Sequence, residues 1–255
     1  MPAQKRSIEL AVFDLDGVIY DIPPYEETSS KIGPSSWNVL FSRLGIYDQH
    51  EQLKRKFISG EFKSYIEWST AACEALKEFG LRKGIFEGII NTRQMAPNAQ
   101  YVVDELHRNG IKVATISGSF GSLSKKAKRV LGLDAYVAHC NLLFDSQGVL
   151  TAWKLERCDY AHKPSSLRRL AKRFRIGVDR CAYIGHEVND IQALRTAGLG
   201  IALNATKESV IKAADVDCHG DISKILGPIL SLPDQIDDPE TMDRNLCVPE
   251  LTARG

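Results

Sequence analysis

The stretch Val12-Phe13-Asp14-Leu15-Asp16-Gly17-Val18 decides the fold class of this chain. The apolar run 8–13 predicts a short buried strand, and Gly17 after the second aspartate indicates a tight turn. Asp14 and Asp16 are therefore expected at the carboxyl end of a central strand, where open α/β sheets bind their ligands. Two carboxylates at that place point to phosphoryl chemistry, with one as the nucleophile and the other as the acid.

An aspartate pair alone would mean little, because aspartate is common where a strand turns into a loop. Three later segments supply the context. Residues 113–120 read as an apolar strand that ends in Ser-Gly-Ser, and Lys163 stands just before the helical pattern 167–174. Residues 182–190 read as another short strand that runs into an acidic loop.

Taken in order, these segments resemble the motifs of the haloacid dehalogenase superfamily of phosphohydrolases. Ser117-Gly118-Ser119-Phe120, the hairpin-like stretch 141–153 and Asn189-Asp190 are similar to its phosphoserine phosphatase-like branch, and the resemblance covers about residues 8–217. It implies an α/β fold, a doubly wound parallel sheet of Rossmann-like type with an inserted helical cap domain. The alternation of predicted strands and helices after residue 97 favours the same parallel sheet.

The paired aspartates have distinct chemical roles in this interpretation. Asp14 would attack phosphorus and form a phosphoaspartate, which splits hydrolysis into two easier displacements. Asp16 would protonate the leaving alkoxide and later take a proton from water, a role that typically contributes ~100-fold to 10,000-fold.

The other predicted site residues handle the phosphoryl group. Ser117 and the backbone around Gly118 and Ser119 would hold its oxygens, because small residues let the backbone approach. Lys163 would offset the developing negative charge. The resemblance also places Asn189 near the phosphate.

The predicted metal site departs from the pattern of the relatives, which carry an aspartate where this chain has His186. The resemblance implies Mg²⁺ held by Asp14 and by the carbonyl of Asp16, with Glu187 or Asp190 completing the site. Imidazole is a poor ligand for Mg²⁺, so Mn²⁺ or Co²⁺ is an alternative, and loss of catalysis is another.

The spacing of the motifs predicts the domain organisation. Residues 1–20 and 97–231 are expected to form the core domain. Residues 21–96 show helical periodicity and are expected to form the helical cap, which would exclude water and select the substrate. Residues 232–255, rich in proline, aspartate and polar residues, are expected to form a loose tail.

Composition excludes several classes of partner. With 33 basic and 32 acidic residues the net charge is +1, and the basic clusters at 125–129 and 168–175 are predicted to be solvated helix faces, so no nucleic-acid partner is expected. No apolar run reaches the ~20 residues that a membrane span needs, and no signal peptide opens the chain, so we expect a cytoplasmic protein. The six cysteines form no C-x-x-C pair and are expected to be buried thiols. No motif fixes the oligomeric state.

The substrate is less constrained than the reaction. The resemblance implies that phosphoserine would need a glutamate and an arginine from the cap, but the expected glutamate position falls on prolines near Glu26 and Glu27, and segment 62–69 contains no arginine. Trp37, Tyr65 and Trp68, with Phe62, either line an apolar or sugar-like pocket or form the core of the cap. We therefore predict a metal-dependent phosphomonoesterase acting on a small phosphorylated metabolite, and these departures disfavour phosphoserine without excluding it.

Three alternatives remain beside that prediction. A catalytically weakened relative would bind a phosphorylated ligand or a protein partner without turnover. A phosphomutase would share the site residues, although its usual substrate loop is not visible. A response-regulator-like receiver would need only about half this length and would have no use for a cap.

Overall fold

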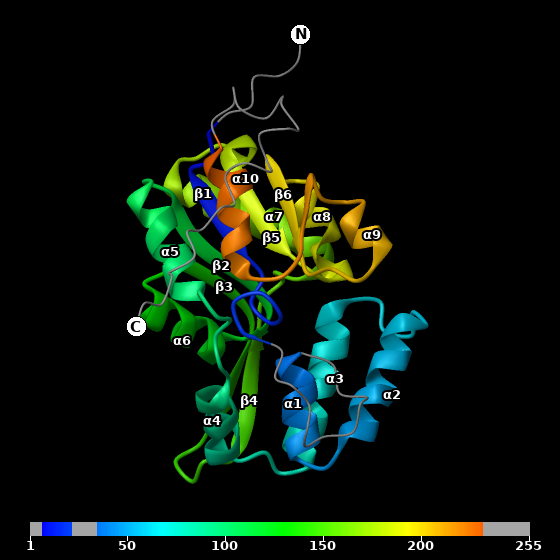
Figure 1. Ribbon diagram of the computed structural model, residues 1–255. Coiled ribbons are helices and arrows are strands. Elements are labelled where there is room, and N and C mark those ends of the chain that lie inside the picture. Colours follow the sequence, from blue (N-terminus) through cyan, green and yellow to red (C-terminus); the bar gives the residue numbers. More distant parts are fainter. Residues whose placement is uncertain (1–6, 22–34, 232–255) are drawn as a thin grey trace, which may run out of the picture.

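The computed structural model describes residues 7–21 and 35–231. Over these ranges seven strands form one sheet in the order β4-β3-β2-β1-β5-β6-β7 (Figure 1). All neighbouring strands pair in parallel except β3 and β4, which are antiparallel. The bounds are β1 Leu10–Phe13, β2 Lys112–Phe120, β3 Ala135–Phe144, β4 Leu150–Leu155, β5 Cys181–Gly185, β6 Leu199–Leu203 and β7 Val216–Cys218.

Helices cover both faces of this sheet. Alternate residues of β1 point to opposite sides, so that Phe13 joins one apolar cluster and Val12 the other. On the Phe13 side pack α5 Ala99–Arg108, α6 Gly121–Leu131 and α10 Leu226–Leu230, and on the Val12 side pack α7 Lys163–Phe174, α8 Ile191–Leu194 and α9 Glu208–Ile211. The short 3₁₀ helices are η1 Tyr160–His162, η2 Val178–Arg180, η3 Val188–Asp190 and η4 Ile222–Ile225. The predicted doubly wound parallel sheet is confirmed.

The hairpin predicted at 141–153 is present as β3 and β4. Its turn forms because Asp145 Oδ1 accepts hydrogen bonds from the N–H groups of Gln147 and Val149, at 2.9 and 2.8 Å. Gly148 has φ of +72°, which suits the residue that closes this turn. The hairpin extends the sheet beyond the carboxyl end of β1 (Figure 1).

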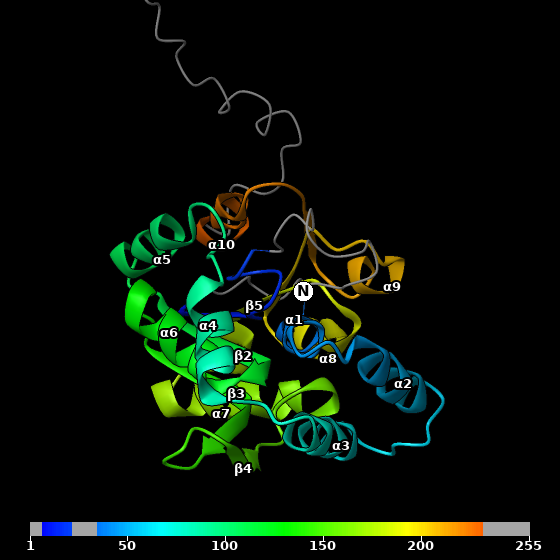
Figure 2. The same ribbon diagram turned by 90° about the horizontal axis from the view of Figure 1, so that it is seen from below.

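Four helices in the described part of the chain lie between β1 and α5: α1 Ser36–Arg43, α2 Tyr47–Ile58, α3 Tyr65–Glu78 and α4 Lys83–Thr92. They lie beyond the carboxyl ends of the parallel strands, with α2 against α3 and α3 against β4 (Figures 1 and 2). Figure 2, a view from that side, shows α4 beside α6, apart from α2 and α3. This arrangement agrees with the helical character predicted for 21–96, and the division into core and cap domains stays a prediction.

Some predictions fall outside the described residues, namely those for Glu26, Glu27 and the tail 232–255. Within the described ranges, five cysteines are buried free thiols, as predicted. No described helix combines the length and the apolar character that a bilayer crossing requires.

Candidate active site

Asp14 follows β1 directly, and its backbone N–H donates to the carbonyl of Ile184 in β5 at 2.8 Å. This bond continues the β1–β5 pairing by one residue and fixes Asp14 at the carboxyl edge of the sheet. After Asp14 the chain turns sharply, and Gly17 has φ of +80°. The sequence predicted that the aspartate pair lies at the end of a central strand, and the structure confirms this position.

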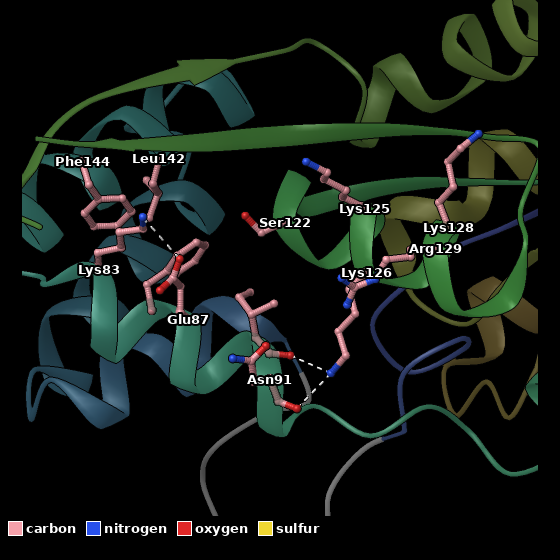
Figure 3. Close-up of a pocket in the computed structure, with 12 residues that line it drawn as sticks. Lys83, Glu87, Asn91, Ser122, Lys125, Lys126, Lys128, Arg129, Leu142 and Phe144 are labelled. Carbon is pink, nitrogen blue, oxygen red and sulfur yellow. Dashed lines mark hydrogen bonds and ion pairs between the residues drawn. The ribbon is translucent and has the colours of Figure 1, made fainter. Parts of the chain in front are cut away.

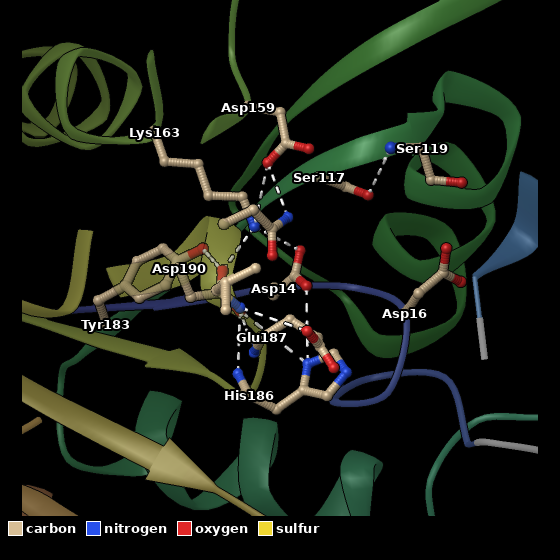
Figure 4. Close-up of polar contacts among 12 residues, drawn as sticks. Asp14, Asp16, Ser117, Ser119, Asp159, Lys163, Tyr183, His186, Glu187 and Asp190 are labelled. Carbon is tan, nitrogen blue, oxygen red and sulfur yellow. Dashed lines mark hydrogen bonds and ion pairs between the residues drawn. The ribbon is translucent and has the colours of Figure 1, made fainter. Parts of the chain in front are cut away.

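Lys163 lies at the centre of a buried ionic cluster (Figure 4). Its fully buried Nζ is 3.0 Å from Asp14 Oδ1, 2.5 Å from Asp190 Oδ1 and 3.4 Å from Asp159 Oδ1. Burial acts to lower the pKa of Lys163, but Asp14 and Asp190 outweigh it and hold that pKa well above its ordinary value. Lys163 is therefore a fixed cation.

Three carboxylates surround this single ammonium, so the cluster carries an excess of negative charge. Burial raises the pKa of Asp14 well above its ordinary value, against the opposing effect of Lys163. For Asp190 burial acts in the same direction, but the charges of Lys163 and His186 prevail and its pKa is lowered. A further cation beside Asp14 would relieve the charge imbalance.

Asp190 anchors the loop that follows β5. Its Oδ1 accepts from Lys163 and from the hydroxyl of Tyr183 at 2.8 Å, and its Oδ2 accepts from the N–H groups of His186 and Glu187 at 2.9 and 3.0 Å. These four donors fill the acceptor positions of a carboxylate. The side chain therefore fixes both the loop and the ammonium of Lys163.

His186 lies where a metal ligand is expected. Asp14, His186 and Asp190 each offer a ligand atom, and these atoms lie within 4.8 Å of one another. Nδ1 of His186 is 3.9 Å from Asp14 Oδ2, and neither of its buried ring nitrogens has a hydrogen-bond partner among the described residues. Buried polar atoms are normally paired, so a carboxylate beside an unpaired imidazole fits a divalent cation.

Glu187, also predicted as a ligand, lies outside that group of three. Its carboxylate accepts a hydrogen bond from Lys207 at 2.6 Å, at a half-exposed position. The structure therefore brings Asp190, and not Glu187, close to Asp14.

The predicted phosphate-binding residues lie beside Asp14. Ser117 and Ser119 are buried, and the N–H of Ser119 donates to Ser117 Oγ at 3.0 Å. A β-carbon on Gly118 would lie 1.9 Å from Asp159 Oδ2, so only glycine fits there. Asn189 lies at the same place and donates to Asp159 Oδ1 at 2.9 Å.

Asp159 is a site residue that sequence reasoning missed. It contacts Gly118, Asn189 and Lys163 together, and it is buried. Its spacing of four residues before Lys163 is the one local feature that could have indicated it.

The helices reach this loop through two aromatic side chains. Nε1 of Trp37 in α1 and the hydroxyl of Tyr65 in α3 both donate to the carbonyl of Gly118, at 3.1 and 2.9 Å. The pKa of Tyr65 is raised well above its ordinary value by burial and by nearby Asp159, so it keeps its donor proton. The loop 117–119, predicted to bind phosphate, is therefore attached to two helices of segment 21–96.

A cavity of about 360 Å³ lies between these helices and the sheet edge. Asp14, Asp16 and Ser117 line its floor, and aromatic rings gather over it. On the helix side the described lining residues are Ser35, Trp37, Asn38, His50, Lys54, Phe57, Ile58, Tyr65 and Trp68. The rings also pack on one another, as in the stacked pair Tyr65 and Trp68 with centroids 5.1 Å apart. The rings of Trp37, Tyr65 and Trp68 therefore both line the cavity and pack in the core of the helices, the two alternatives that the sequence left open.

A second hollow, of about 810 Å³, lies among α4, α6 and the β3–β4 hairpin (Figure 3). There Nζ of Lys126 donates to the carbonyls of Ile90, Asn91 and Arg93 at 2.9 to 3.0 Å. These hydrogen bonds cap the carboxyl end of α4. The predicted solvated face of α6 is therefore wrong for Lys126, which holds α4 to the core.

Comparisons with known proteins agree with this geometry. A family model described as haloacid dehalogenase-like hydrolase matches residues 8–198. The phosphoserine phosphatase of Archaeoglobus fulgidus is 30% identical over 235 residues, covering 89% of this chain, which in turn spans 61% of that protein. The phosphoserine phosphatase of Idiomarina loihiensis is 29% identical over 227 residues, covering 88% of this chain and 94% of that protein.

Solved structures share the fold. A phosphoserine phosphatase described as a phospho-aspartyl intermediate analogue superposes with a TM-score of 0.72 at 24% identity, covering 88% of this chain and all of the other. A hydrolase of the same family from Salmonella enterica gives a TM-score of 0.74 at 19% identity, covering 90% of this chain and 73% of the other.

Proposed function

Because this chain belongs to the haloacid dehalogenase-like hydrolase family, in its phosphoserine phosphatase-like branch, we propose that it hydrolyses a small phosphomonoester through a phosphoaspartate on Asp14. The matching family model confirms the family that the sequence predicted, and the similarity to curated phosphoserine phosphatases supports the predicted enzyme class. The observation that carries the proposal is the contact of Lys163 with Asp14, beside the loop 117–119. This contact places the permanent positive charge of Lys163 next to the Asp14 carboxylate at the carboxyl edge of the sheet.

The first displacement forms the phosphoenzyme. A carboxylate oxygen of Asp14 bonds to phosphorus while the ester P–O bond breaks, and its electron pair leaves with the alkoxide oxygen, which takes a proton from Asp16. Lys163 and the N–H groups of the loop 117–119 stabilise the charge on the phosphoryl oxygens.

The second displacement regenerates the enzyme. Water gives a proton to Asp16 as its oxygen bonds to phosphorus, and the acyl P–O bond breaks. Orthophosphate leaves and Asp14 returns to a carboxylate. Asp190 keeps the Lys163 ammonium in one place through both steps.

Asp14 and His186 are the side chains that would hold a divalent cation, with Asp190 behind them. Such an ion supplies positive charge opposite the phosphoryl oxygens. An imidazole ligand favours Mn²⁺ or Co²⁺ over Mg²⁺, the ion used generally by this family, because Mg²⁺ prefers oxygen. We expect His186→Asp to strengthen Mg²⁺ binding relative to Mn²⁺ binding in calorimetric titrations. Co²⁺ bound to the unaltered protein should show a visible absorption spectrum, and His186→Asp should alter that spectrum.

The cavity indicates the class of substrate. The described residues that line it include no arginine, and on its helix side they offer Lys54 but no carboxylate, so that side lacks a partner for the ammonium group of an amino acid. Its aromatic rings suit an apolar or planar leaving group. We therefore propose a phosphomonoester of an apolar or planar alcohol, and we expect phosphoserine to be turned over less efficiently.

The test is phosphate release from a panel that includes benzyl phosphate and phosphoserine, with Mg²⁺, Mn²⁺, Co²⁺ or EDTA. The control is Asp14→Asn. Metal-dependent release that Asp14→Asn abolishes, with an acid-stable and alkali-labile phosphoenzyme, supports the proposal. No release above this control with any metal would refute it and favour a protein that binds its phosphorylated ligand without turnover, with His186 as the cause.

A further inference from the structure

Three donors hold the carboxylate of Asp16. The N–H of Ser36 donates to Oδ2 at 3.0 Å, while Ser36 Oγ and Nη2 of Arg93 donate to Oδ1 at 2.6 and 3.0 Å. Both residues are buried, and the Asp16 side chain is 14% exposed. A carboxylate offers about four acceptor positions, so the donors in the described part of the chain leave one position on Oδ2.

Ser36 lies at the start and Arg93 at the end of the segment that contains helices α1 to α4. Ser36 is the first residue of α1, where the helix dipole favours a negative charge. Arg93 follows α4, just before the chain rejoins the core through the bond from Ala96 N–H to the carbonyl of Ile19. The carboxylate of Asp16 is thus bonded to both ends of that segment.

The backbones of the two donors are fixed independently of Asp16. The carbonyl of Arg93 accepts from Nζ of Lys126 at 2.9 Å. Ser35 Oγ accepts from the N–H of Trp37 and so caps α1 around Ser36. Donors on a fixed backbone hold a carboxylate in one orientation.

Figure 4 shows the resulting direction of the side chain: Asp16 lies apart from the Lys163 cluster and is turned away from it. It still lines the cavity that Asp14 and Ser117 share. The carboxylate thus lies where the floor of the cavity meets the helices, the side on which a leaving group would lie.

We propose that Ser36 and Arg93 are positioning residues that hold the Asp16 carboxylate toward the leaving-group oxygen; this inference rests on the proposed phosphatase reaction. Neither residue touches the substrate in this scheme. They act through Asp16 alone, so their loss matters only to the steps that need its proton.

Two esters of similar size test this inference. p-Nitrophenolate leaves at neutral pH without a proton, whereas the alkoxide of benzyl phosphate needs one. Because kcat/KM reports steps through phosphoenzyme formation, Arg93→Gln and Ser36→Ala should lower kcat/KM for benzyl phosphate by about 10- to 100-fold and for p-nitrophenyl phosphate by less than about threefold. Arg93→Lys, which keeps a cation, should recover part of the loss.

Combination with Asp16→Asn supplies the second test. If Arg93 acts through Asp16, Asp16→Asn/Arg93→Gln should be no slower on benzyl phosphate than Asp16→Asn alone. Equal losses on both esters, or a further loss in the double variant, would show a structural role and overturn the inference. A gain in activity on removing Arg93 would also overturn it. If the unaltered protein cleaves neither ester with any metal, the proposed function fails, and the inference fails with it.

Discussion

The imidazole of His186 lies directly against Gly17, so that a β-carbon at position 17 would stand 2.4 Å from Nε2 and 2.7 Å from Cε1. The positive φ of Gly17 is a second reason for glycine at this place. The turn after Asp14 thus sets the position of the imidazole that we propose as a metal ligand.

Gly17→Ala should therefore displace His186 as well as strain the turn. The positive φ costs about 1 kcal/mol for alanine, and the collision adds to that cost. Gly45→Ala is a matched control, because Gly45 also has positive φ, +71°, but a β-carbon there would meet none of the described residues within 4 Å. We expect urea unfolding to show a larger loss for Gly17→Ala, with weaker Mn²⁺ binding for that variant alone. Equal losses would refute the contact.

Lys163→Met should destabilise the fold as well as stop phosphate release. Three buried carboxylates would lose their only close ammonium among the described residues, a change that costs about 3–5 kcal/mol. Lys207→Met is the control, since its ion pair with Glu187 is half exposed and is expected to contribute at most about 1 kcal/mol. Chemical denaturation at pH 7 measures both, and similar small losses would contradict the expected importance of the cluster.

His50 should make stability depend on pH. Burial lowers its pKa to about 4, against the opposing effect of Glu51, whereas an unfolded histidine titrates near 6.5. Between these values the unfolded chain binds a proton that the folded chain does not, so this group contributes full stability above about pH 6.5. That stability is lost as the pH falls toward 4, at about 1.4 kcal/mol per pH unit.

His50→Gln should remove this part of the slope when unfolding is measured between pH 4.5 and 6.5. If the pH dependence of stability is the same in His50→Gln and in the unaltered protein, His50 binds its proton equally in the folded and unfolded states, and the prediction is wrong.

Trp37 and Tyr65 should act redundantly on the Gly118 carbonyl. Either Trp37→Phe or Tyr65→Phe leaves one donor in place, so the lost hydrogen bond should cost at most about 1.5 kcal/mol in each. The double variant leaves the carbonyl without these two donors and should cost more than the sum. Additive losses in urea unfolding would show that the two bonds are independent.

Much of the fold was predictable because its signals are local. Apolar runs gave the strands around 8–13, 113–120 and 182–190, and β2 continues through Ser117-Gly118-Ser119 to Phe120. Within segment 21–96, for which the sequence predicted only helical periodicity, α3 begins at Tyr65. Ser64 Oγ accepts there from the N–H of Glu67, and the Glu67 carboxylate accepts from the N–H of Lys63. The edge strand β7 was missed, since three residues carry no periodicity.

The candidate site was predictable only as far as its motifs extend. Asp14 and Asp190 follow β1 and β5, Ser117 lies near the end of β2, and Lys163 begins α7, so these four side chains meet at the carboxyl edge of the sheet. Ser36, Arg93 and Tyr183 were missed, since their partners lie far away in the sequence or inside the core, and no local pattern encodes such pairs. The assignment of catalytic and metal-binding roles to individual residues stays a prediction.

The carbonyl of Gly118 has a thermodynamic consequence for the whole molecule. The loop proposed to receive the phosphoryl group is the loop on which α1 and α3 rest, through Trp37 and Tyr65. Any ligand that reorients this peptide group must alter the free energy with which those helices dock, and docking must alter ligand affinity by the same factor. Occupancy of the cavity and the placement of the helices are therefore reciprocally coupled, without any need for a separate regulatory site.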